Sequence, residues 1–132
     1  MLLTKNLAPL RASALASIDT SAGEVRKLFI TSVPGQEMVY QQKQVEAEML
    51  MANATVAVGE IPHIAAEAVL NQITPYDQAV RVLLVTEQWK TISAQIEVMR
   101  LGAKKAVALA GNPAEIDRAA TVDWSAIRGA AT

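Results

Sequence analysis

Few side chains in this sequence have the type and spacing that acid–base or metal chemistry requires. His63 is the only histidine, and cysteine is absent, which excludes disulfides, thiol catalysis and cysteine–zinc sites. A general base needs an orienting partner, and after Pro62 the histidine is better placed at an exposed helix start. We therefore expect His63 to be a surface residue.

The acidic residues also fail to make a metal site. Glu46 and Glu48 stand two positions apart, as do Glu115 and Asp117. On a helix a two-residue step turns side chains to different faces, so neither pair can grip one ion. We expect a solvated surface at both places, with no catalytic residue, no cofactor and no metal, and therefore no enzyme.

Composition limits the partners. The chain has 132 residues, enough for one domain, with net charge −1 and pI near 5.8. Nucleic acid and anionic membranes need a concentrated basic face, which this balance argues against. The sequence contains no run of about 18 apolar residues, so we expect no membrane span. The first residues lack an apolar run with a cleavage region, so we expect no signal peptide and synthesis in the cytoplasm of the producing cell.

Prolines and capping residues predict the helix boundaries. Pro34 should end the helix arriving from residue 22 and begin another that runs to about Asn53, forming a helix–turn–helix corner. Residues 53–62 form a loop, and 63–73 a short helix. Thr74 then caps the longest helix, which runs from Pro75 to about residue 110. Asn112 and Pro113 begin a further short helix over 114–120, followed by an irregular or weakly helical tail.

Apolar spacing predicts which faces are buried. Between residues 10 and 31 the steps alternate three and four through Leu15, Ile18, Ala22, Val25 and Phe29, a pattern typical of a packed or coiled helix. The polar stretch 19–23 leaves open one helix with a soft centre or two shorter helices. The stripe is buried either on the helix after Pro34 or on a partner, and we expect a partner.

The remaining helices carry their own stripes. The helix after Pro34 is apolar on two sides, and the short helix should turn Ile64, Ala68 and either Val69 or Leu70 inward. The long helix has a seam of apolar residues on which Trp89 should be core. The basic residues 100–105 near its end complement the helix dipole. Trp124, in the tail, is suited to anchoring a partner.

These elements predict an all-α fold. We expect a small helical bundle of about five helices, with a long helix in the C-terminal half and the corner at Pro34. Residues 1–9 form an apolar N-terminal tail, 10–120 a single helical domain and 121–132 a C-terminal tail.

Two blocks resemble a helical module of tailed-bacteriophage and prophage tail proteins. They are RKLFITSVPGQEMVYQQKQVEAEM (26–49) and TEQWKTISAQIEVMRLGAKKAV (86–107). In that module an arginine-led turn starts a helix, and a later tryptophan-containing helix packs against it. The module is found in tail-fibre or fibre-associated chains and carries no ligand signature. Residues 1–19 and the C-terminal tail lie outside it.

The resemblance implies a virion role without enzymatic activity. We expect a structural subunit of the phage tail, at the baseplate or the fibre attachment, acting through helix-mediated contacts with other tail proteins. A tail-fibre assembly chaperone absent from the mature virion is the alternative. The chain should be a homo-oligomer or dock on a larger oligomer. The expected partner interface comprises Leu3, Leu7, Leu15, Ile18, Val25, Phe29 and Trp124.

Overall fold

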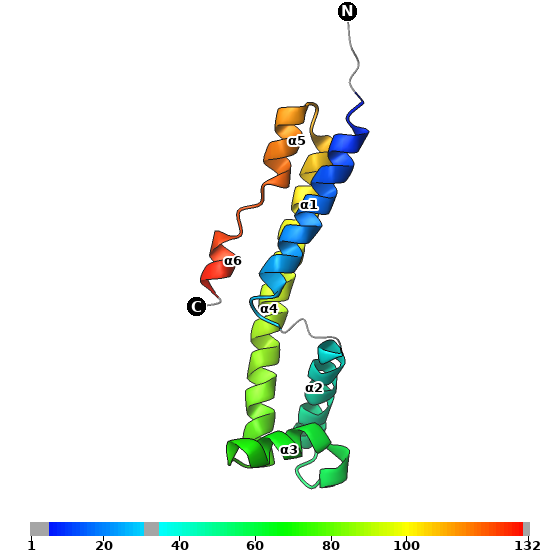
Figure 1. Cartoon of the computed structure of the whole chain (residues 1–132). Helices are drawn as coiled ribbons and strands as arrows, with labels where there is room; N and C mark the ends of the chain where they lie inside the picture. Colours follow the sequence, from blue (N-terminus) through cyan, green and yellow to red (C-terminus); the bar gives the residue numbers. More distant parts are fainter. Residues whose placement is uncertain (1–5, 31–34, 131–132) are drawn as a thin grey trace, which may run out of the picture. The chain divides into compact units, whose positions relative to one another are not determined.

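The computed structural model describes residues 6–30 and 35–130 and is all-α over those residues, with no strand among them (Figure 1). The helices are α1 (Ala8–Arg26), α2 (Gln36–Ala52), α3 (Pro62–Asn71), α4 (Pro75–Leu109), α5 (Pro113–Ala120) and α6 (Ser125–Gly129), with a 3₁₀ turn, η1 (Val58–Glu60). The predicted fold class is thus confirmed. The chain divides into two compact units, and the domain boundaries expected at 1–9, 10–120 and 121–132 stay predictions.

Helix α4 supplies residues to both units. Unit 1 contains residues 1–30 and 92–132, and unit 2 contains residues 31–91. With 35 residues, α4 is about 50 Å long, and each half of it carries a separate hydrophobic cluster. Each unit is therefore described by itself.

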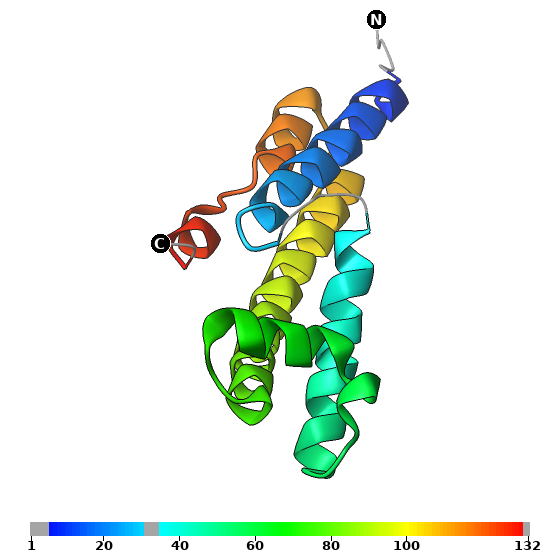
Figure 2. The ribbon, with the colours of Figure 1, turned by 60° about the horizontal axis from the view of Figure 1, so that its bottom comes forward.

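Unit 1 is built on the apolar stripe of α1. The helix is continuous from Ala8 to Arg26, so the polar stretch 19–23 does not break it. In Figures 1 and 2, α1 runs beside the second half of α4, and α5 lies beside α1. The buried cluster there comprises Ala14, Ile18, Val107, Ala110 and Ile116. The stripe is therefore buried within unit 1, where Ile18 packs against the end of α4 and against α5.

Ion pairs join α1 to α4 at the edge of this core. Asp19 accepts hydrogen bonds from Arg100 (2.8 Å) and Lys104 (2.9 Å), and Arg26 pairs with Glu97 at 2.9 Å. The hydrogen bonds that Arg100 donates to Glu97, and then the one it donates to Asp19, raise the pKa of Arg100. The basic residues predicted to complement the helix dipole thus bind α1 instead, except Lys105, for which the described residues show no ion pair.

Unit 2 is a three-helix arrangement of α2, α3 and the first half of α4. Ala47 and Leu50 of α2 pack with Ile61, Ile64 and Ala79 in its core. Figure 2 shows α3 crossing close to α2, and Lys43 of α2 pairs with Glu67 of α3 at 2.9 Å. The tight turn after α3 forms because Gln72 adopts the left-handed conformation at φ 57°.

Several predicted boundaries are confirmed and one lies outside the described residues. The hydroxyl of Thr74 accepts from the Asp77 N–H at 3.1 Å, and Asn112 Oδ1 accepts from the Glu115 N–H at 2.9 Å, so both act as N-caps. The corner at Pro34 falls in residues 31–34, which the structure does not describe. Helix α2 begins at Gln36, after Gly35 at φ 84°, a conformation that glycine adopts most readily.

Candidate functional site: a buried carboxylate and the exposed apolar faces

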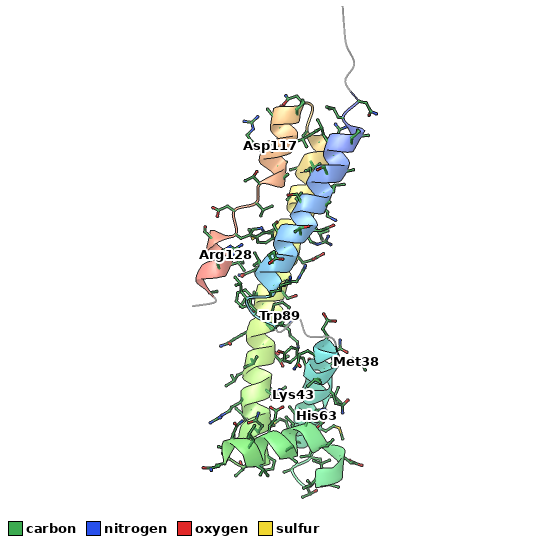
Figure 3. The ribbon with its side chains drawn as sticks, viewed as in Figure 1. Met38, Lys43, His63, Trp89, Asp117 and Arg128 are labelled. Atoms are coloured by element: carbon green, nitrogen blue, oxygen red, sulfur yellow. The ribbon has the colours of Figure 1, made fainter. Side chains whose placement is uncertain are left out.

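An organised polar site lies in unit 2, where Glu46 of α2 meets the start of α3. His63, at that start, is labelled in Figure 3. Glu46 is completely buried. Its Oε1 accepts from the backbone N–H groups of His63 (2.7 Å) and Ile64 (3.2 Å), and its Oε2 lies 2.6 Å from His63 Nδ1. The carboxylate therefore caps a helix from 17 residues away in the sequence.

This cap is needed because α3 has no local one. The residue before it, Ile61, has an apolar side chain and caps nothing, while Pro62 occupies the first helical position. The next two N–H groups would be left without partners in the core. Glu46 satisfies both and adds a negative charge at the positive end of the helix dipole. The prediction of a solvated Glu46 is thus wrong. His63 does lie at a helix start with its side chain partly exposed, but its partner Glu46 was missed, since no local pattern links two residues on different helices.

The pKa of Glu46 shifts below its usual value. Burial raises the pKa of Glu46. The hydrogen bonds that its carboxylate accepts together lower the pKa by more than burial raises it; they come from the Ile64 backbone, the His63 ring, the Gln42 side chain and the His63 backbone. The ionised form is therefore the one that the fold stabilises.

We expect acid to destabilise unit 2 through this group. Because the folded pKa of Glu46 lies below its ordinary 4.5, its stabilisation is complete above that value and is lost as the pH falls through the folded pKa. Urea unfolding measured from pH 7 to pH 3 should show the native chain losing more stability than Glu46→Gln. Equal losses in the two proteins would contradict this, since all other carboxylates are shared.

The Glu46–His63 pair holds the start of α3 against α2, through one side-chain contact and two backbone hydrogen bonds. No cluster of three metal-ligating side chains occurs in the described part of the chain.

The structure places most of the predicted interface residues inside the chain. Ile18 and Val25 are fully buried, and Trp124 is 5% exposed with its indole N–H donating to Ser21 Oγ at 3.1 Å. Leu7 and Leu15 pack against the unit 1 core. The assignment of these residues to a partner surface is corrected accordingly, because α4 and α5 of the same chain cover the stripe.

The other residues of that set give less information. Phe29 is half-buried, and Leu3 lies outside the described residues. Trp89, expected in the core, is also only half-buried. Trp124 is therefore the more deeply buried of the two tryptophans.

Other apolar side chains remain exposed and were missed. On α3, Val69 is 80% and Leu70 is 79% exposed, although one of them was predicted to point inward. Ala66 is exposed on the same helix one turn earlier. We call Ala66, Val69 and Leu70 the α3 face. Almost every residue from 64 to 70 is apolar, so periodicity could not show which side faces the core.

A second exposed set runs along α4. Val98 is 71% exposed and Leu101 is 51% exposed, whereas Ile96, two residues before Val98, is fully buried. Leu84, near the start of the helix, is 60% exposed. Within the described residues, no helix is both long and apolar enough to cross a bilayer.

Comparison of the chain with protein-family models, with curated proteins and with solved structures gives no match.

Proposed function

We propose that this chain is a structural subunit of a bacteriophage tail, at the baseplate or the fibre attachment, and that it acts through helix-mediated contacts with other tail proteins. The resemblance of residues 26–49 and 86–107 to phage tail modules supports the phage assignment. The observation that supports a binding role is the α3 face, where two adjacent large apolar side chains are about four-fifths exposed.

The α3 face is suited to a protein partner. A valine and a leucine buried together on binding contribute on the order of 1.5–3 kcal/mol each. Two sets of contacts hold α3 in place. Glu67 pairs with Lys43 and accepts a hydrogen bond from Gln78, and Glu46 caps the start of the helix. The two apolar side chains are thus presented by a helix held at both ends, which lowers the ordering cost of binding.

A double substitution tests this role. Val69→Gln with Leu70→Gln should leave the unfolding free energy within about 0.5 kcal/mol of the native chain, because both side chains are exposed. The variant should be lost from tailed particles purified from producing cells, as measured by quantitative mass spectrometry. Glu48→Gln, an exposed change on α2, is the control and should be incorporated normally.

The same measurement separates the two phage roles. A structural subunit is present in the purified particle at a fixed ratio to the other tail proteins. An assembly chaperone is required for tails to form but is missing from the finished particle. Tails that form normally without the chain, and never contain it, would overturn the proposal.

A further inference from the structure

The two units of the chain carry opposite charges. Unit 2 contains seven acidic and three basic residues, whereas unit 1 contains six acidic and nine basic residues. Their formal net charges at pH 7 are therefore −4 and +3, although the whole chain is nearly neutral at −1. Like charge opposes contacts between the same unit of two copies, and unlike charge favours contacts between unit 2 of one copy and unit 1 of another.

Each unit also presents exposed apolar side chains on one helix. In unit 2 they form the α3 face, where Val69 and Leu70 are about four-fifths exposed. In unit 1, Val98 and Leu101 are 71% and 51% exposed, and the exposed Ala94 lies one turn before Val98. We call Ala94, Val98 and Leu101 the α4 patch. Their spacing of four and three residues places them on one side of the helix, and all three belong to unit 1.

We propose that the α3 face of one copy of this chain binds the α4 patch of a second copy. Each surface lies within one unit, so the pairing does not depend on how the two units of a chain are arranged. The contact joins two different surfaces, so each copy can bind a further copy through its other surface. The inference rests on the proposed function only in taking the α3 face as a binding surface, and it names the partner of that face.

The two surfaces match in size. Helix α3 has 10 residues and is about 15 Å long, and the α4 patch together with the exposed Gly102 extends about 12 Å along α4. Ala66 lies beside the large side chains of the α3 face, as Ala94 and Gly102 do beside those of the α4 patch. Small residues next to large ones let two helices approach closely, with the large side chains of each in the grooves of the other.

Charged side chains that make no ion pair flank both surfaces. Lys105 is exposed and follows the α4 patch by one turn. Glu60 is exposed two residues before α3 begins, and Asp77 is exposed six residues after it ends. The part of the chain that the structure describes shows no ion pair for any of the three. An acidic side chain therefore lies near each end of α3, where Lys105 of a second copy can meet it, and such charges at the edge of an interface favour one partner over others.

Complementing variants of the full-length chain test the pairing. Sedimentation velocity should show the native chain associating as its concentration rises to about 0.5 mM. Val69→Gln with Leu70→Gln removes the α3 face, and Val98→Gln with Leu101→Gln removes the α4 patch. Each variant alone should have a dissociation constant raised at least tenfold. An equimolar mixture of the two should form a 1:1 complex and nothing larger, because one intact α3 face and one intact α4 patch remain for pairing.

The alternatives give different results. Unchanged circular dichroism and unfolding of both variants would show that the exposed substitutions leave the fold intact. A mixture that associates no better than either variant would show that each surface binds its own kind, and would contradict the inference. A native chain that stays monomeric at 0.5 mM would also overturn it; if the variant without the α3 face were still lost from tailed particles, the proposed function would stand with another tail protein on that face. Native association with complementing variants, in a chain absent from particles and not needed for tails, would overturn the tail role alone.

Salt and one charge reversal test the selection of the partner by charge. Raising sodium chloride from about 50 mM to about 500 mM should weaken the association about tenfold, because the charges of the two units are then screened. Lys105→Glu should raise the dissociation constant about fivefold at low salt. Arg118→Glu makes the same change in charge on α5 of unit 1, at another exposed position, and is the control. An affinity that does not fall with salt, or equal effects of the two reversals, would contradict the placement of Lys105 at the contact.

Discussion

Glu46→Ala is expected to lower the free energy of unfolding of unit 2 by about 2–4 kcal/mol. The substitution removes the partner of two backbone N–H groups, those of His63 and Ile64, at the buried start of α3. Alanine favours helix, so α2 itself should lose nothing from the change. Urea unfolding followed by circular dichroism measures the loss.

Glu48→Ala is the matched control. It changes the same residue type on the same helix, but Glu48 is exposed, and its carboxylate accepts a hydrogen bond from Gln44, one turn away. Its effect should stay within about 0.5 kcal/mol. If both alanine variants are equally stable, the capping of α3 by Glu46 is not what holds that helix in place.

Trp124→Ala is expected to cost about 3–5 kcal/mol in unit 1. The indole is 5% exposed, and its N–H donates to Ser21 Oγ, whose own hydroxyl donates to the Ile18 carbonyl. The side chain therefore fixes the segment between α5 and α6 onto α1. Denaturant unfolding of the single variant gives the cost.

Two further variants distinguish a core residue from a partner anchor. Trp124→Phe keeps most of the ring and loses the hydrogen bond, so it should cost about 1–2 kcal/mol. Trp89→Ala should cost less than Trp124→Ala because Trp89 is only half-buried. A Trp124→Ala protein as stable as the native chain would return Trp124 to the surface role that its position in the tail first indicated.

The local signals in the sequence predicted the helices well. Thr74 and Asn112 cap helices as expected, and α4 and α5 have the predicted extents within one residue. Each of these signals acts between residues three or four apart, so neighbouring letters contain all of the information.

The site could not be predicted in the same way. Glu46 and His63 come together only because α2 and α3 pack, and nothing near either residue indicates the other. Val25 and Trp124 are residue types that are also common in interfaces. Only the fold shows that other parts of the same chain bury them.

The division of the chain sets the order in which its parts can fold during synthesis. Unit 2 is one continuous stretch, residues 31–91, and has all its helices once that stretch has left the ribosome. Helix α1 is made first, yet Ile18 packs with Val107 and Ile116, which follow roughly 90 residues later. At about 5–20 residues per second, its apolar stripe has no native partner for several seconds. The stripe that is core in the finished chain is thus exposed surface in the nascent one, and a chaperone would meet it there.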